Sequence, residues 1–432
     1  MVVAFETLFL GLVFGAVPVR VAVGPEVATV ELRLDGAPVA TLRGAPWVHG
    51  VQLGPAPHPH ELEAVARSAA GKELARARQR LNLPRAEAEV HLVIERGPDG
   101  GRTAARLTWD ETAAREPTHI EVTLDGAPVL VEDRHRVVLP PVAPAVPHVI
   151  TVELTFPGGT RAHTEAVFGG DVSEEVRSDL TAVPLVFAEQ RDLPTPAVMA
   201  RWLSDGVEPL RVVGIERGPA EVVFVVDQSS AGRLSARWDV YRPRPAFGTR
   251  FAPGSHDDRF YVLLPSPRGR AGRATELRNL YPFLGPVVLE LDTLCEVAVD
   301  LRFSSADPLA QSLGNAVALA GLHAAGSNRR RAVVLVLASN GEATGTVRVA
   351  AARAFLADLS VPLVLWSIED TPERRRTAWG EAEDVSSLPR LRQALGGLTK
   401  RLEDQSIVWV EGSPLPQRIA LDESLTGVRI AR

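Results

Sequence analysis

The stretch TVELRLDGAPVATL at residues 29–42 decides how the first part of this chain folds. Apolar and polar residues alternate up to Leu34, which is the pattern of a half-buried β-strand, and Asp35-Gly36 follows at once. Asp-Gly after an alternating run favours a tight hairpin, because glycine adopts the positive φ that the turn requires. We therefore predict a β-hairpin at this place.

The same stretch returns later in the chain. Residues 119–132 read HIEVTLDGAPVLVE, so that DGAPV recurs 90 residues further on, with Asp125 in the place of Asp35. A repeat of this length that consists of short strands is typical of a β-sandwich. We predict two tandem all-β sandwiches, over residues 1–84 and 86–169.

The second half of the chain has a different pattern. A connector over residues 171–217, expected to hold a strand pair, is followed by unbroken apolar runs at 221–226, 332–337 and 361–366, with helical patterns between or after them. Unbroken runs are typical of parallel strands that helices cover on both faces. Residues 218–432 are therefore predicted to form a doubly wound, Rossmannoid α/β domain, and the whole chain to be multidomain.

Composition excludes several classes of function. The 432 residues are 45% hydrophobic and 23% charged, as in ordinary globular proteins. A single cysteine, Cys295, allows no intrachain disulfide and no cysteine-based zinc or iron–sulfur site. The chain lacks the GxxxxGK[ST] motif of a phosphate-binding loop. Its formal net charge of −6 provides no general attraction to nucleic acid.

An apolar run near the start, Leu8 to Val17, has the length of a signal-peptide core. Glu6 and the lack of a basic flank argue against that reading, and we interpret the run as a strand. No transmembrane segment is expected, because no 18 apolar residues follow one another without a charge. The architecture favours an extracytoplasmic or cell-envelope location, although this chain contains no convincing signal peptide.

Polar residues follow the predicted parallel strands. Asp227 and Ser229 lie directly after the first run, Asp307 precedes a predicted helix, and Asn340 follows a later run. Ligands of open α/β sheets bind beyond the carboxyl ends of the strands. We therefore expect these four residues to converge in one cleft.

These loops resemble those of a von Willebrand factor A domain, in the form found in VWFA-related bacterial proteins. The metal-ion-dependent adhesion site of that family is built from DxSxS, a threonine in a second loop and Asp-Gly in a third. The resemblance runs from Thr181 to Arg432. The two repeats before it similarly resemble immunoglobulin-like or fibronectin-III-like modules, without the immunoglobulin cysteine and tryptophan signature.

The resemblance implies a metal site made of Asp227, Ser229, Asp307 and Asn340. Ala231 stands where the second serine belongs, so that one oxygen ligand is missing, and Asn340 replaces a charged aspartate. Mg²⁺ prefers a near-octahedral set of oxygen ligands. We expect a degenerate site that binds Mg²⁺ weakly or not at all in the isolated protein. A purely structural alternative is that the Asp227 carboxylate caps the next helix or accepts hydrogen bonds from backbone amides of the loop.

A histidine pair and an arginine-rich segment are two further candidate sites. His58 and His60 have a spacing that suits a metal, but no third ligand is evident, and a loop or strand-edge role is the better interpretation; Pro59-His60 recurs as Pro147-His148. Residues 242–278 contain eight arginines against three acidic residues, interleaved with aromatics. We interpret this segment as a solvated or protein-contacting insertion rather than a nucleic-acid site.

The leading hypothesis is a non-enzymatic, adhesion-type protein that contacts another protein through the loops at the strand ends. A structural subunit of a homomeric or heteromeric assembly, formed by self-association of sandwich edges, is the alternative. A metal-using hydrolase is disfavoured, because no base, nucleophile and oxyanion-binding set can be assembled from these motifs. No catalytic residue and no cofactor other than Mg²⁺ is expected.

Overall fold

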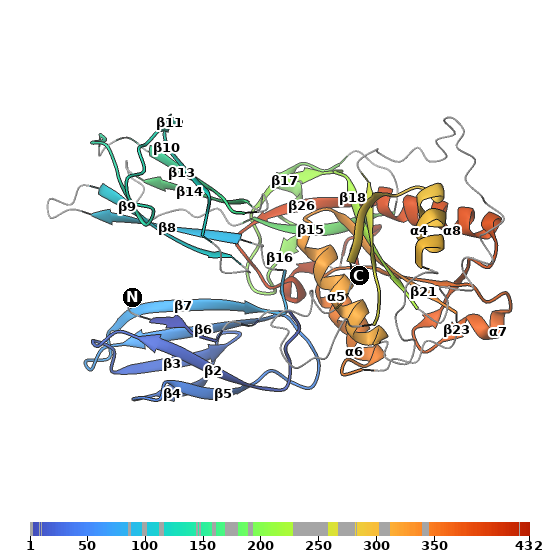
Figure 1. Cartoon of the computed structure of the whole chain (residues 1–432), viewed down its shortest axis with the longest axis horizontal. Helices are drawn as coiled ribbons and strands as arrows, with labels where there is room; N and C mark the ends of the chain where they lie inside the picture. Colours follow the sequence, from blue (N-terminus) through green and yellow to red (C-terminus); the bar gives the residue numbers. More distant parts are fainter. Residues whose placement is uncertain are drawn as a thin grey trace. The chain divides into compact units, whose positions relative to one another are not determined.

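A computed structural model of the chain shows several separate β-sheets and few helices (Figure 1). No described helix is long and apolar enough to cross a membrane. The structure describes residues 3–7, 9, 11–84, 88–96, 102–111, 116–143, 146, 148–157, 161–168, 180–188, 193–227, 258–266, 281, 283–301, 312–338, 345–422 and 424–432.

The first sandwich consists of two antiparallel sheets around one core. Fully buried Val19 from one sheet packs with Leu32 and Leu62 from the other. One sheet has the order β1 (Val3–Phe5), β2 (Ala16–Val23), β5 (Val48–Gln52), and the second has the order β4 (Ala37–Leu42), β3 (Thr29–Leu34), β6 (His60–Arg67), β7 (Glu73–Leu81).

The second sandwich has a core of its own, in which Leu92, Leu107 and Ile150 are almost fully buried. Its sheets have the orders β8 (Ala88–Arg96), β9 (Arg102–Glu111), β12 (Arg136–Val138), and β11 (Ala127–Pro128), β10 (His119–Leu124), β13 (His148–Thr155), β14 (Arg161–Phe168).

The two sandwiches share one strand order, as the repeat predicts. The sheet β1-β2-β5 corresponds to β8-β9-β12, and β4-β3-β6-β7 corresponds to β11-β10-β13-β14. Asp35 and Gly36 have φ values of 53° and 85°, and Asp125 and Gly126 have 51° and 78°. Positive φ at both central residues is the geometry of a type I′ hairpin turn. The prediction that the two Asp-Gly pairs occupy equivalent turns is confirmed.

A six-stranded sheet forms the centre of the second half of the chain. Val222 of β18 lies opposite Ala332 of β21 in a parallel pair, and both strands are buried along their whole length. The prediction that these two apolar runs are neighbouring parallel strands is confirmed. The order is β20 (Phe283–Val288), β19 (Arg259–Leu263), β18 (Ala220–Val226), β21 (Arg330–Leu337), β22 (Leu363–Ser367), β25 (Glu383–Asp384), and only β20 runs antiparallel to its neighbour.

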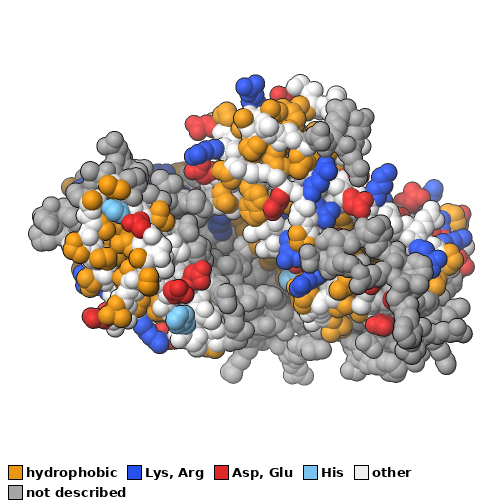
Figure 2. Space-filling model, turned by 90° about the horizontal axis from the view of Figure 1, so that it is seen from above, with side chains coloured by type: hydrophobic (Ala, Val, Ile, Leu, Met, Phe, Trp, Pro, Cys, Tyr) orange, Lys and Arg blue, Asp and Glu red, His pale blue; other side chains and the backbone are white. Residues whose placement is uncertain are grey.

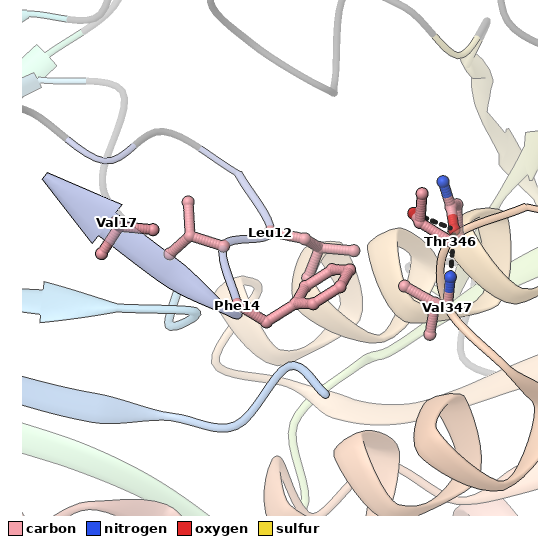
Figure 3. A pocket seen from close by; sticks show the side chains of 7 residues that line it. Leu12, Phe14, Val17, Thr346 and Val347 are labelled. Atoms are coloured by element: carbon pink, nitrogen blue, oxygen red, sulfur yellow. Dashed lines mark hydrogen bonds between the residues drawn. The ribbon is translucent and has the colours of Figure 1, made fainter. Parts of the chain in front are cut away.

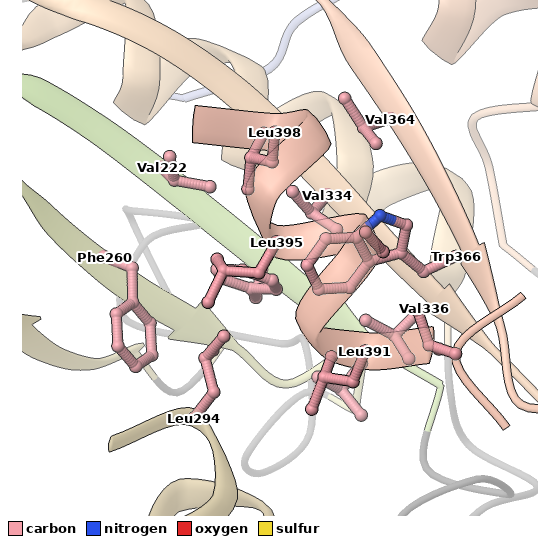
Figure 4. Close-up of a cluster of buried hydrophobic side chains, with 14 of the residues drawn as sticks. Val222, Phe260, Leu294, Val334, Val336, Val364, Trp366, Leu391, Leu395 and Leu398 are labelled. Atoms are coloured by element: carbon pink, nitrogen blue, oxygen red, sulfur yellow. The ribbon is translucent and has the colours of Figure 1, made fainter. Parts of the chain in front are cut away.

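Helices cover both faces of this sheet. Alternate residues of β18 point to opposite sides, so that Val222 packs in one core and Val223 in the other. Helices α4 (Leu291–Leu301) and α8 (Leu388–Glu403) pack in the first core, where Leu391, Leu395 and Leu398 of α8 lie over the sheet (Figure 4). Helices α5 (Leu313–Gly326) and α6 (Val349–Asp358) pack in the second.

A smaller sheet joins the connector to the C-terminal tail. Its order is β17 (Val212–Glu216), β26 (Gln405–Glu411), β15 (Leu180–Phe187), β28 (Val428–Ile430). The two longer strands of the connector, β15 and β17, therefore do not pair with each other, because β26 from the tail lies between them. Nearby, β16 (Leu203–Ser204) pairs with β27 (Ala420–Leu421), next to the short helices α1 (Pro196–Met199) and η2 (Pro416–Arg418). Near β25, the edge strand of the six-stranded sheet, lie α7 (Pro372–Arg375) and the hairpin β23 (Arg376–Thr377), β24 (Gly380–Glu381). Arg375 Nη1 donates to Asp384 of β25.

The N-terminal apolar run is not the strand that we expected over its whole length. Residues 11–15 are outside any strand, and β2 begins only at Ala16. The physical reason is tertiary packing: Leu12 is buried in the core that helices α5 and α6 form with the sheet, and Phe14 packs against it. Burial against helices, rather than in a β-ladder, accounts for the apolar character of this segment.

Contacts divide the chain into two compact units, residues 1–84 with 181–432, and residues 85–180. In the first unit, hydrogen bonds tie the first sandwich to the later segments. His58 Nδ1 lies 2.7 Å from Asp358 Oδ2 at the end of α6, Gln417 Nε2 donates to Pro59 O, and Arg418 Nη2 donates to Asp35 O. The first sandwich is thus part of one compact body with the α/β segment.

Candidate functional site

The strand order of the large sheet defines where a ligand would bind. In chain order it reads 3-2-1-4-5-6, so that the chain leaves β18 toward one edge and returns through β21 on the other side. A topological switch point lies between two neighbouring parallel strands whose following connections run to opposite sides of the sheet. Open α/β sheets bind ligands in the crevice beyond the carboxyl ends of those strands. The candidate site therefore lies beyond the ends of β18 and β21.

Asp227 lies at this point. It directly follows β18, and its backbone N–H donates to Val336 O of β21 at 2.9 Å, which fixes it at the end of the ladder. The residue has no exposed surface. A fully buried aspartate at the switch point, where open α/β sheets bind their ligands, is therefore the site candidate in the described part of this edge.

The other predicted ligands are not among the residues that the structure describes. Ser229, Asp307 and Asn340, and also Ala231, fall in the segments 228–257, 302–311 and 339–344. Convergence of the four residues in one cleft therefore remains a prediction that rests on Asp227 alone.

A second buried carboxylate at the same sheet edge was missed in the sequence. Glu369 follows β22 and is only 4% exposed, and its Oε2 lies 3.3 Å from Arg374 Nη1. Its backbone N–H donates to the hydroxyl of Ser367, which is fully buried. The signal was present, because Glu369 follows an apolar run just as Asp227 does, but no motif drew attention to it.

The loop after β21 is attached to the start of α5. Asn315 Oδ1 accepts hydrogen bonds from Thr346 Oγ1 at 3.2 Å and from the backbone N–H of Val347 at 2.9 Å. Gly345 has φ +117°, and a Cβ added there would lie 1.8 Å from Ser312 Oγ. Because Ser312 N in turn donates to Pro265 O after β19, the described ends of these loops are held in close contact.

His58 and His60, the two histidines considered as metal ligands, each have a carboxylate partner. His60 Nδ1 lies 2.7 Å from Asp35 Oδ2, and its Nε2 lies 3.2 Å from Leu53 O. Asp35 Oδ1 also accepts the backbone N–H of Glu61. Within the described residues no group of three or more His, Cys, Asp or Glu side chains is arranged to hold a metal ion.

The arginine-rich segment is described only in part. Of residues 242–278 the structure describes 258–266, which contain β19. Asp258 is buried there, accepts the N–H of Ala220 at 2.7 Å and pairs with Arg330 at 3.4 Å. On the face shown in Figure 2, described Lys and Arg side chains lie among acidic and hydrophobic ones.

Comparison with known proteins gives no family. No protein-family model and no curated protein matches the chain. Among solved structures, the fibronectin(III)-like modules of Clostridium thermocellum CbhA are 13% identical, with 18% of this chain and 92% of that chain covered and a TM-score of 0.17. The central fibronectin-III array of RIM-binding protein is 13% identical, with 43% and 79% covered and a TM-score of 0.25.

A third similar structure is SGBP-B of the Bacteroides ovatus mixed-linkage glucan utilization locus, solved in complex with a mixed-linkage heptasaccharide. It is 12% identical, with 41% of this chain and 47% of that chain covered and a TM-score of 0.15. Because these TM-scores are low, the similar structures contribute nothing to the functional argument.

Proposed function

We propose that this is a non-enzymatic, adhesion-type protein that binds another protein through the loops at the carboxyl edge of its six-stranded sheet. The observation that carries the proposal is the fully buried Asp227 at the switch point between β18 and β21. In this proposal the α/β segment is a von Willebrand factor A-like domain, and the sandwiches act as spacer and packing surface.

The proposed metal site is degenerate. Asp227, Ser229, Asp307 and Asn340 would offer oxygen atoms to Mg²⁺, whereas Ala231 offers none and Asn340 brings no charge. A carboxylate of the partner protein would supply the missing oxygen and negative charge. Affinity for Mg²⁺ is therefore expected to rise when the partner is bound, and the two binding events to be coupled reciprocally.

Two polar side chains in the described part of the edge are held by contacts within the protein. The hydroxyl of Ser367 accepts the backbone N–H of Glu369, and the Glu369 carboxylate pairs with Arg374. These contacts give both side chains a structural role.

A second candidate function is that of a structural subunit. The observation in its favour is exposed apolar surface on the second sandwich, where Leu130 is 76% and Val138 is 61% exposed. Apolar side chains and strand edges of this kind are natural contact surfaces between copies. Light scattering during size-exclusion chromatography separates the two functions, because a monomer at every concentration contradicts the structural subunit.

The protein-binding proposal is tested by capture of partners from the native extract in Mg²⁺ and in EDTA. Three baits are compared: wild type, Asp227→Ala, and Asp422→Ala as a control, since Asp422 is a carboxylate in the tail whose Oδ1 accepts the backbone N–H of Ser424. We expect a partner that the wild type and the control retain in Mg²⁺ and that Asp227→Ala loses. Retention of the same proteins by all three baits, with and without EDTA, contradicts the proposal.

A further inference from the structure

A cavity of about 320 Å³ lies beside the carboxyl edge of the sheet, within the first compact unit. The N-terminal segment of the first sandwich forms one wall, and the starts of helices α5 and α6 form the other. Figure 3 shows Leu12 and Phe14 extending toward Thr346 and Val347. The lining residues are Leu12, Val13, Phe14, Val17, Asn315, Thr346 and Val347.

Most of the lining is apolar and well packed from behind. Leu12 is 8% and Val347 is 2% exposed, and both belong to the hydrophobic core between the sheet and helices α5 and α6. The walls are therefore supported by a rigid core. Small-molecule sites typically have volumes of about 300–1,000 Å³, apolar walls, a few fixed polar groups and a position between domains. This cavity shares their volume, their largely apolar walls and their few polar groups.

The polar end of the cavity is built from Asn315 and Thr346. Asn315 Oδ1 already accepts hydrogen bonds from Thr346 Oγ1 and from the backbone N–H of Val347. Both contacts use Oδ1, so the group of Asn315 that remains for a ligand is its amide Nδ2–H₂, which is a donor only, whereas Thr346 Oγ1 keeps lone pairs that can accept. A ligand that contacts Asn315 must therefore bring a hydrogen-bond acceptor.

We propose that this cavity binds a small amphipathic molecule, with an apolar body against Leu12, Phe14 and Val347 and a neutral carbonyl oxygen that accepts from Asn315. The carbonyl belongs to a free amphiphile, because the volume of about 320 Å³ lies at the lower end of the range of small-molecule sites. The site is separate from Asp227, and it holds whether or not that residue binds metal.

The test uses the full chain with ¹³C-labelled Leu and Val methyl groups and follows the signals of Leu12, Val17 and Val347. Hexanamide has the chain and the acceptor, hexylamine has the chain with a cationic donor, and acetamide has the acceptor without the chain. We expect saturable shifts with hexanamide, and binding roughly tenfold or more weaker with the other two, because each loses either the apolar contact or the hydrogen bond. N-acetyl-leucinamide represents a polypeptide ligand, and tighter binding of it than of hexanamide would contradict a free amphiphile.

Asn315→Asp is the decisive variant. Aspartate keeps the oxygen that accepts from Thr346 and Val347, but it presents a second oxygen where the amide donor was. We expect hexanamide to bind roughly tenfold more weakly and hexylamine to bind more tightly. Val17→Phe, which fills the cavity from the opposite wall, is expected to abolish both shifts. Absence of methyl shifts with hexanamide in the wild type, or equal hexanamide affinity in Asn315→Asp, overturns the proposal.

Discussion

His60 Nδ1 lies 2.7 Å from Asp35 Oδ2, and the same contact recurs in the second sandwich, where His148 Nδ1 lies 2.6 Å from Asp125 Oδ2. In each sandwich the aspartate is in the hairpin turn and the histidine is the first residue of the third strand of the same sheet. The two short sequences that recur in the repeat, DG and PH, are thus partners in one hydrogen-bonded unit. In both sandwiches this contact joins the hairpin turn to the start of the neighbouring strand.

This pair makes the stability of the first sandwich depend on pH. Its hydrogen bond to Asp35 raises the pKa of His60 above 6.5. Burial raises the pKa of Asp35, but hydrogen bonds from His60 and from the N–H of Glu61 outweigh burial and hold it below 3.8. The histidine contribution is complete below pH 6.5 and is lost as pH rises through the folded-state pKa, whereas the aspartate contribution is lost as pH falls through its folded-state pKa. We expect greatest stabilisation between about pH 4 and 6.5.

Asp35→Asn tests this directly, because asparagine also tolerates the positive φ of the turn and keeps an acceptor for Glu61 N. Urea unfolding, followed by the amide signals of β6 and β7 from pH 5 to 8, should show a decline in the wild type that the variant lacks. The ring signals of His60 should titrate at a lower pH in the variant. An unchanged pH profile in Asp35→Asn contradicts the assignment.

Gly345→Ala should disturb the loop beside the candidate site. Its φ of +117° is unfavourable for any residue with a Cβ, and that Cβ would meet Ser312 Oγ at 1.8 Å. We expect a loss of at least about 2 kcal/mol in the free energy of unfolding. Gly396→Ala in α8 is the matched control, since nothing lies within 4 Å of its added Cβ, and it should gain about 0.5–1 kcal/mol. Equal effects of the two changes would contradict this description of the loop.

Arg331 should be among the least replaceable residues of the sheet. It is 4% exposed, and burial lowers its pKa to about 10. Its guanidinium donates to the carbonyls of Ala325 at 2.8 Å and Ser360 at 3.3 Å, where helices α5 and α6 end. Lysine cannot reach both carbonyls with the same geometry. Arg331→Lys is therefore expected to lose about 2–4 kcal/mol in chemical denaturation, and a loss below about 0.5 kcal/mol would contradict this role.

Sequence patterns predicted the strands that are buried on one face or on both. Alternation around Leu32 and the unbroken run around Val223 each have a single physical cause, which is burial against a defined neighbour. The order in which strands pair is not a local property. Nothing in the tail residues 405–411 indicates that they insert between β15 and β17, and nothing near Leu12 indicates that it packs against helices rather than in a ladder.

The place of Asp227 in the sheet was predictable, whereas its neighbours at the sheet edge were not. Asp227 could be placed at a strand end because a carboxylate directly follows a buried run, and the structure puts it at the switch point. Glu369 follows an equivalent run. Its place at the same sheet edge as Asp227 depends on β22 pairing with β21, which only the assembled sheet reveals. The His60–Asp35 pair was missed for the same reason, since its partners are 25 residues apart.

The most direct test of the central claim is calorimetric titration of Mg²⁺ into wild type, Asp227→Ala and Ala231→Ser. The account predicts weak or undetectable binding to the free wild type, none to Asp227→Ala, and stronger binding to Ala231→Ser, because the serine would restore the second hydroxyl of the DxSxS pattern. Tight, stoichiometric binding to the wild type that disappears in Asp227→Ala would contradict a degenerate site that needs a partner carboxylate.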